Sequence, residues 1–217
     1  MAQKKVNAVI HSQEKLAEGI YSMWLDAPEM AKAAVPGQFI AVYTNDQSKL
    51  LPRPISICEA DKENGRLRIV YRIAGAGTKE FSAYKEGDTL DIMGPLGNGF
   101  PLKKKKAFLI GGGIGIPPML ELAKNLDCEK TAVIGYRDKE TFLADELRKY
   151  ADVVIATEDG SVGTKGNVID AIRPRGARLA SLRHEAFGYS IGFRYLEDPA
   201  VPDSTTDKPG PNEEKAQ

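Results

Sequence analysis

The first hundred residues are short runs rich in β-branched and aromatic side chains, separated by turn residues. Apolar and polar positions alternate with a period of two in several runs, as in half-buried strands. Asn64-Gly65 lies between two runs and is typical of a β-hairpin turn. Six short strands at this spacing predict an antiparallel sandwich or a small barrel. The expected strands are 6–10, 20–25, 39–43, 55–58, 67–73 and 89–93.

The pattern changes near residue 102. Four lysines, Lys103–Lys106, precede the apolar run Ala107–Ile110, and we interpret them as a solvated entry to a strand rather than a nucleic-acid patch. Further apolar runs then alternate with helical patterns, which predicts a parallel sheet with crossover helices. We therefore divide the chain into domains 1–101 and 102–172. The expected elements of the second domain are strands 107–110, 131–136 and 151–156, with helices 117–126 and 140–150.

The last part of the chain has a different composition. Residues 173–217 contain five arginines and two lysines, whereas residues 1–172 contain six arginines and 17 lysines. From Asp198 onward Pro, Asp, Ser, Thr, Lys and Glu dominate. Such a composition buries too little apolar surface to fold, so we expect a divergent, disordered tail at 173–217.

Charge and cysteine content narrow the class of protein. The chain has 217 residues with 30 basic and 30 acidic side chains, which argues against bulk binding to nucleic acid or anionic membranes. Its longest uncharged stretch, Ala107–Leu120, is shorter than the roughly 20 apolar residues of a membrane span. The polar N-terminus does not resemble a signal peptide. Two cysteines fit a reducing cytoplasm.

Several residues favour structural readings over chemical ones. His11 and His184 are isolated, so we expect no histidine metal site or catalytic triad. Cys58 and Cys128 are expected to be small buried or half-buried residues rather than nucleophiles. Trp24, in an alternating run, is expected in the core.

Arg53–Ile57 forms the first candidate site. The Arg53 guanidinium offers a fork of donors suited to phosphate oxygens, and Pro54 makes the backbone beside it rigid. Side chains two apart in a strand share a face, so Ser56 lies on the same side as Pro54, where its hydroxyl is available to a ligand. A plain strand start with an exposed arginine is the alternative.

Gly75–Glu80 forms the second candidate site. Its glycines allow close approach of the backbone to a ligand, and Thr78 is a candidate N-cap for a helix through Tyr84. Free amides at such a helix start bind phosphate. A capped turn without a ligand is the alternative.

Two further loops lie at the carboxyl edge of the predicted parallel sheet. Gly111–Met119 joins a buried strand to a helix that Pro117 can open, which is where α/β sheets hold pyrophosphate. The strict G-x-G-x-x-G spacing is absent, because Ile116 or Pro118 takes the third glycine's place. Thr157–Gly166 offers acidic side chains that could accept hydrogen bonds from ribose hydroxyls, with a bland polar loop as the alternative.

Taken in this order, the motifs resemble those of the ferredoxin-NADP reductase superfamily and, within it, the electron-transfer subunits of class B dihydroorotate dehydrogenase. The resemblance covers about residues 4–172 and includes Gly94–Phe100, which matches a loop closing the barrel. Ile55 replaces a tyrosine that relatives often stack on the flavin, and is typical of this subfamily. The cofactor-binding residues implied by the residues and the resemblance are Arg53, Pro54, Ile55, Ser56, Val70, Tyr71, Arg72, Gly77, Thr78, Gly111, Gly112, Gly113, Gly115 and Pro117.

The resemblance implies a six-stranded antiparallel FAD-binding barrel followed by an NAD-binding α/β domain. NADH would reduce the flavin, and a [2Fe-2S] cluster would connect it with the FMN of a partner catalytic subunit oxidising dihydroorotate, in a cytoplasmic hetero-oligomer serving pyrimidine biosynthesis. Arg53 would neutralise pyrophosphate, Ser56 would bond the isoalloxazine edge, backbone 70–72 would hold the ring, and glycines 111–115 would seat NADH. A subunit of another NADH-dependent ferredoxin or hydrogenase system, and an FAD-binding chain without turnover, are the alternatives.

The chain departs from this resemblance after Ile172. Family members continue with a β-α unit carrying Cys-Gly-Pro and then a cysteine-rich cluster module. A [2Fe-2S] cluster needs four ligands, usually thiolates, and two upstream cysteines cannot supply them. We therefore expect a truncated α/β domain without a cluster, and a tail that is out-of-frame or otherwise replaced coding sequence. FAD binding is better supported than NADH turnover, because the missing unit normally helps to wall the nicotinamide pocket.

Overall fold

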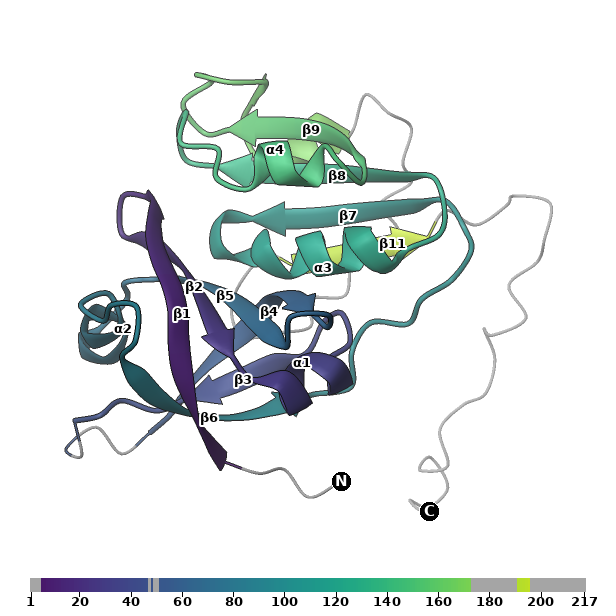
Figure 1. Ribbon diagram of the computed structural model, residues 1–217. Helices are drawn as coiled ribbons and strands as arrows, with labels where there is room; N and C mark the ends of the chain where they lie inside the picture. The colour runs from purple at the N-terminus through teal and green to yellow at the C-terminus, as the bar shows by residue number, and fades with distance from the viewer. Residues whose placement is uncertain (1–4, 47, 49–50, 173–190, 196–217) are drawn as a thin grey trace, which may run out of the picture.

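The computed structural model describes residues 5–46, 48 and 51–172, together with the backbone of 191–195. It consists of a closed β-barrel and, beside it, an α/β unit formed by a second sheet and its helices (Figure 1). Within the described residues, no helix is long and apolar enough to cross a membrane.

The first half is a six-stranded antiparallel barrel, which confirms the predicted barrel and excludes the sandwich. The strand order is β1-β2-β5-β4-β3-β6, and the ring closes between β6 and β1. Alternating side chains such as Met23, Leu25, Leu67 and Ile69 fill its interior. The strands are β1 (Lys5–Ala17), β2 (Ile20–Asp26), β3 (Phe39–Val42), β4 (Arg53–Asp61), β5 (Arg66–Arg72) and β6 (Thr89–Leu96), with helices α1 (Pro28–Ala33) and α2 (Ala76–Phe81).

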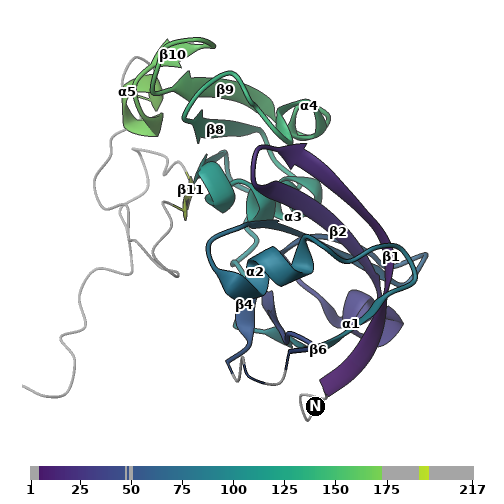
Figure 2. The ribbon, with the colours of Figure 1, turned by 90° about the vertical axis from the view of Figure 1, so that its left-hand side faces the viewer.

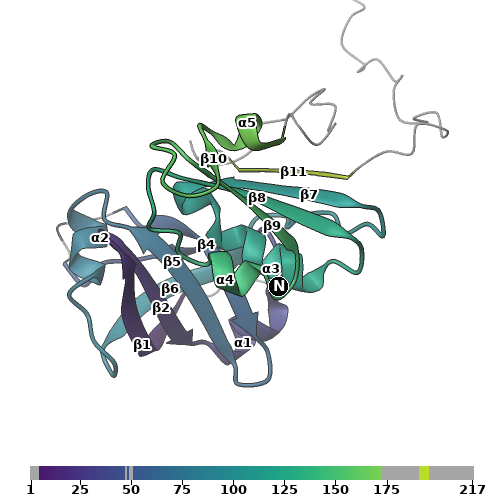
Figure 3. The same cartoon turned by 90° about the horizontal axis from the view of Figure 1, so that it is seen from above.

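The second half has the predicted parallel sheet. Its order is β10-β9-β8-β7-β11, in which the first four strands are parallel. Helices α3 and α4 lie between this sheet and the barrel, while α5 covers the other face (Figure 3). The elements are β7 (Ala107–Gly112), the 3-10 turn η1 (Gly113–Gly115), α3 (Pro117–Asn125), β8 (Lys130–Tyr136), α4 (Ala144–Leu147), β9 (Asp152–Thr157), β10 (Thr164–Lys165) and α5 (Val168–Ile172).

Several segments differ from the expected elements, among them α1, α5 and β10, which the sequence did not predict. The helix expected over 140–150 is reduced to α4, because Leu143 has a left-handed φ of 64° that no helix continues through. The preceding turn instead places Phe142 against Tyr136, whose hydroxyl donates to the Phe142 carbonyl at 2.7 Å. In the tail, β11 (Ile191–Tyr195) pairs antiparallel with β7, a strand the sequence did not predict. The remaining tail positions, for which disorder was expected, lie outside the described residues.

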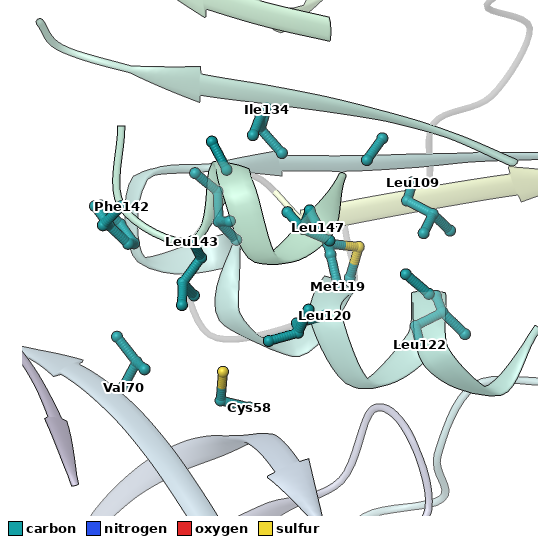
Figure 4. Packing of buried hydrophobic residues seen from close by; sticks show 14 of the residues in the cluster. Cys58, Val70, Leu109, Met119, Leu120, Leu122, Ile134, Phe142, Leu143 and Leu147 are labelled. Atoms are coloured by element: carbon teal, nitrogen blue, oxygen red, sulfur yellow. The ribbon is translucent and has the colours of Figure 1, made fainter. Parts of the chain in front are cut away.

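The barrel and the α/β unit share one apolar cluster. Cys58 of β4 and Val70 of β5 point out of the barrel and join a cluster with side chains of α3 and α4 and of Leu143, which precedes α4; Leu120 of α3 is among them (Figure 4). Both barrel residues are buried. Because this cluster is completed from both sides, neither half could move away without exposing apolar surface.

The β1–β2 hairpin forms a second contact between the halves. β1 extends seven residues past its predicted end, and the tip of the hairpin reaches the α/β unit near α4 (Figure 2). Ala17 and Ile20 join the shared cluster there, and the Glu18 amide donates to Glu140 Oε2 at 3.1 Å. The hairpin therefore supports the α/β unit from the side.

We expect Cys58 to resist thiol reagents in the folded protein. Burial in the shared cluster raises the pKa of its thiol, so almost no thiolate is present or accessible at neutral pH. Iodoacetamide treatment followed by mass spectrometry should label the partly buried Cys128 and leave Cys58 unmodified until guanidinium is added. Native labelling of both cysteines at equal rates would show that the halves separate in solution.

Candidate functional site

Arg53 and Gly77 lie together at the rim of the barrel. Arg53 is the first residue of β4, and its guanidinium rests against the backbone of α2. A Cβ atom on Gly77 would lie 2.2 Å from Arg53 Nε, so the guanidinium takes this position because residue 77 has no side chain. The Arg53 Nη1 group also donates to the Leu51 carbonyl. A cationic fork is thus held at the barrel rim beside the start of α2.

Thr78 does not cap α2 as predicted. The cap residue is Gly75, whose extended backbone lets the helix begin two residues before Thr78. The Thr78 hydroxyl folds back onto the preceding loop, accepting from the Ala74 amide at 2.8 Å and donating to the Gly75 carbonyl at 3.1 Å. Its role in the structure is therefore to close the loop that leads into α2.

β4 and β5 separate at the same rim. Their pairing runs from Asp61 opposite Arg66 to Ile57 opposite Ile69 and stops there, although both strands continue. Residues 53–56 and 70–72 consequently border a gap between the two strands. Ile55 turns into the barrel, whereas Pro54 and Ser56 are on the opposite face, as the period-two alternation predicts.

Tyr71 faces the barrel interior, whereas Val70 and Arg72 lie on the outer face of β5. Tyr71 is buried in the barrel, where its ring stacks on Tyr21 at 5.9 Å and its hydroxyl donates to Gln13 Oε1 at 2.8 Å. Burial raises the pKa of that phenol, which stays neutral. Val70 belongs to the shared apolar cluster, and Arg72 is exposed. Among these side chains Arg72 alone is free to meet a ligand, so Val70 and Tyr71 can contribute only backbone groups.

Arg72 points to the glycine-rich turn of the other half. A Cβ atom on Gly113, which has a left-handed φ of 52°, would lie 3.0 Å from Arg72 Nη2. At Gly111 a Cβ atom would lie 3.0 Å from the Gly115 carbonyl oxygen, because the turn folds back over the end of β7. Pro117 opens α3, as predicted. The turn is therefore compact and lies directly opposite the barrel rim.

A cavity of about 270 Å³ opens between these elements. It lies at the carboxyl ends of β7, β8 and β9, the edge where open α/β sheets bind their ligands. Arg72 lines the cavity from the barrel side. Of the two acidic residues in the Thr157–Gly166 loop, Glu158 lines the cavity, whereas the Asp159 carboxylate accepts from the Ser161 amide at 2.9 Å within the loop. The lining residues are Arg72, Gly112, Gly113, Gly135, Tyr136, Arg137, Glu158, Gly166, Asn167 and Val168.

Five lining residues are neither among the cofactor-binding residues predicted from the sequence nor in the Thr157–Gly166 loop: Gly135, Tyr136, Arg137, Asn167 and Val168. Arg137 follows β8 in a position equivalent to that of Glu158 after β9, so the carboxyl-edge rule could have found it. Asn167 and Val168 lie at the start of α5, where the Asn167 side chain accepts the Ile169 amide at 2.8 Å. An Asn before an apolar run is a cap signal, but it does not by itself indicate a cavity.

Comparison with known proteins agrees with this geometry. Residues 7–100 match the oxidoreductase FAD-binding domain family. The barrel, the rim and this match define the class: an FAD-binding oxidoreductase of the ferredoxin-reductase type. The chain is 46% identical over 173 residues to the dihydroorotate dehydrogenase B (NAD(+)) electron transfer subunit of Streptococcus mutans, with 76% of this chain and 66% of the relative covered. The same subunit of a Geobacillus strain is 40% identical over 184 residues, covering 81% and 71%. The chain belongs to this family of electron-transfer subunits.

Solved structures give the same picture. The NADH-dependent reduced ferredoxin-NADP oxidoreductase, described for flavin-based electron bifurcation, superposes with a TM-score of 0.72 at 31% identity, covering 82% of this chain and 66% of that one. A ferredoxin-NADP reductase of Neisseria gonorrhoeae with bound FAD and NADP has a TM-score of 0.65 at 18% identity, covering 80% and 77%, and shows the shared fold. The chain spans 64% of the length of the Streptococcus pneumoniae relative.

The chain's own cysteines do not fit an iron-sulfur cluster. It has two, Cys58 and Cys128, and Cys58 is enclosed in the apolar cluster between the halves. Four ligands are needed, so these residues cannot hold a [2Fe-2S] centre. The rim around Arg53 and Gly77, in contrast, fits a dinucleotide phosphate: it combines a fixed cation with backbone that has no side chain in the way.

We expect Gly77→Ala to weaken FAD binding without weakening the fold. The added Cβ atom would displace the flexible Arg53 guanidinium, while alanine favours the helix over glycine by up to about 1 kcal/mol. Losing one charge-assisted bond of about 2 kcal/mol would raise the FAD dissociation constant roughly thirtyfold, measured by fluorescence titration.

Gly75→Ala is the matched control for this variant. Its backbone is extended and nothing lies within 4 Å of the added Cβ atom, so FAD affinity should stay near that of the parent protein. If Gly77→Ala and Gly75→Ala bound FAD with equal affinity, Arg53 would have no part in FAD binding.

Proposed function

We propose that this protein is an FAD-containing electron-transfer subunit, which passes electrons between NAD(H) and a dihydroorotate dehydrogenase catalytic subunit in pyrimidine biosynthesis. The observation that supports this most directly is the position of the Arg53 rim and the cavity on either side of Arg72. Two neighbouring sites suited to dinucleotides are what an NADH-linked flavoprotein requires. The proposal assigns FAD to residues 1–101 and NAD(H) to residues 102–172.

In this proposal the chain's residues bind and orient rather than react. Bound FAD would supply two-electron exchange with NAD(H) and one-electron exchange with a partner. Arg53 would hold the pyrophosphate, with Gly77 giving it room and Thr78 fixing the loop. Ser56 and backbone 70–72 would border the flavin ring, because β4 and β5 diverge there.

The cavity would receive NAD(H). Arg72 and Arg137 supply positive charge for its phosphates, and Glu158 supplies an acceptor for a ribose hydroxyl. The turn over residues 111–115, with Pro117 after it, would let the nucleotide approach the backbone closely. Arg72 would connect the two sites, because it lines the cavity and ends the 70–72 segment that would border the flavin ring.

The partner is proposed from the relatives' names, since those proteins are electron-transfer subunits of dihydroorotate dehydrogenase B. An FMN-containing catalytic subunit in a cytoplasmic hetero-oligomer would complete the system. A reductase subunit of another NADH- and ferredoxin-linked system is the second candidate, favoured by the likeness to the bifurcating oxidoreductase. Co-purification of the full chain with either flavoprotein distinguishes the two.

We expect the purified protein to be yellow and to release FAD on denaturation, and Arg53→Ala to lose most of it. Removing a charge-assisted contact of about 2 kcal/mol should raise the FAD dissociation constant roughly thirtyfold. Arg66→Ala is the control, because Arg66 pairs with Asp26 at the other end of β5 and should retain FAD. A colourless parent protein that does not take up FAD would refute the proposal.

We expect NADH to bleach the flavin absorbance of the FAD-loaded protein under anaerobic conditions. Arg137→Ala should require about tenfold more NADH for half-bleaching, since one phosphate contact is lost, and should keep its FAD. Arg148→Ala, which removes an exposed arginine paired with Asp145, should behave like the parent. A flavin that stays oxidised in excess NADH would favour a chain that binds FAD without turnover.

A further inference from the structure

Arg68 is a nearly buried cation at the junction between the two halves. Its residue is 5% exposed, although it lies on the outer face of β5. A charge withdrawn from water in this way is tolerated only when it is paired and hydrogen-bonded. The Arg68 Nε group donates to Ser22 Oγ at 2.9 Å. The guanidinium carbon lies over the Trp24 ring, 5.7 Å from the ring centre.

The main partner of Arg68 comes from the other half. The two terminal guanidinium nitrogens donate to Glu146 of α4, with Nη1 at 2.5 Å from Oε2 and Nη2 at 3.1 Å from Oε1. Such a two-point contact restrains direction as well as distance, because the planar fork and the carboxylate must stay aligned. Glu146 is therefore tied to a barrel strand rather than only packed near it.

A second ion pair supports the first. Arg68 lies 3.5 Å from Glu59 of β4, and the other oxygen of Glu59 accepts from Lys124 of α3 at 2.5 Å. Glu14 of β1 lies 3.7 Å from Arg68 but is largely exposed. Both helices that face the barrel are thus joined to it through charged groups, at α4 by Glu146 and at α3 by Lys124.

This junction is built on the same strand face as the cavity. Side chains at 68, 70 and 72 alternate outward from β5, while those at 67, 69 and 71 fill the barrel. Along this face Arg68 contacts α4, Val70 enters the shared cluster and Arg72 reaches Gly113. Arg68 and Arg72 are about 13 Å apart along the strand, at roughly 3.3 Å per residue. A rotation of the whole α/β unit about Val70 would consequently change the distance between Arg72 and the glycine-rich turn.

We propose that Arg68 and Glu146 are a positioning pair, which holds the α/β unit at the angle that brings a nucleotide in the cavity into line with the barrel rim. The inference rests on the proposed function in one respect: the reacting groups are taken to be NADH in the cavity and FAD at the rim. Neither residue lines the cavity. Their effect is transmitted through α4 and β5.

The test compares Glu146→Gln with Asp145→Asn in the FAD-loaded full chain. Glutamine keeps the size of Glu146 but removes its charge, whereas Asp145 is the preceding residue of α4 and its side chain is 94% exposed. We expect the limiting rate of flavin reduction at saturating NADH, measured by stopped-flow, to fall about tenfold in Glu146→Gln. FAD content should be unchanged, and Asp145→Asn should reduce at the parent rate. At temperatures well below unfolding, a variant that is only less stable should still be reduced at the parent rate.

Hydrogen exchange provides a readout that does not require NADH turnover. In Glu146→Gln the amides of 112–115 and of β5 should exchange faster than in the parent, and in Asp145→Asn they should not. Arg68→Lys, which keeps the charge and loses the two-point contact, should fall between the two. If NADH fails to reduce the parent protein, the proposed function fails and the exchange data still decide the positioning role. Parent-like exchange and parent-like reduction in Glu146→Gln would each overturn the proposal.

Discussion

The shared apolar cluster between barrel and α/β unit is the constraint on which the arrangement depends. Cys58 and Val70 leave the barrel on its outer side and complete the packing beneath α3 and α4. Burying a side chain the size of valine contributes about 1.5 to 3 kcal/mol, and these contacts cannot form within either half alone. These contacts fix how the α/β unit sits against the barrel. They therefore also fix the position of the cavity at Arg72 relative to the rim at Arg53.

Within this frame, the candidate sites are shaped by missing groups as much as by side chains. At Gly77 the lack of a Cβ atom lets the Arg53 guanidinium lie on α2, and at Gly111 it lets the turn fold back over β7. Between β4 and β5 the pairing is missing beyond Ile57 and Ile69. Each omission leaves backbone accessible beside a cation, which is the combination a dinucleotide phosphate needs.

The sequence was sufficient for the barrel and the parallel sheet, because these depend on local signals. Runs of strand-forming residues between turn residues, several of them alternating with a period of two, located all six barrel strands, and the glycine-rich turn located the carboxyl edge. Local signals misplaced the N-cap of α2, which is Gly75 rather than Thr78. They also predicted too long a helix at 140–150, because leucine at position 143 gives no indication of the left-handed backbone that it adopts.

Long-range pairing could not be predicted from the sequence. Arg68 and Glu146 are 78 positions apart, and neither has a signature that selects the other. Trp24 shows the same limit: it was expected in the core, but Met23 and Leu25 occupy the barrel interior and Trp24 lies outside it, partly buried, over Arg68. A period-two pattern shows that a strand has two different faces. Which face packs against another element is decided only by the complete fold.

The two faces of β5 also restrict how this chain can change over evolution. One face completes the barrel and the other carries the junction and the rim of the cavity, so insertion or deletion of a single residue would exchange them. Charged groups would then enter the barrel while Tyr71 and Ile69 turned toward α4. An insertion or deletion in this strand keeps each side chain on its face only if it involves an even number of residues. The loops at either end of the strand are not restricted in this way.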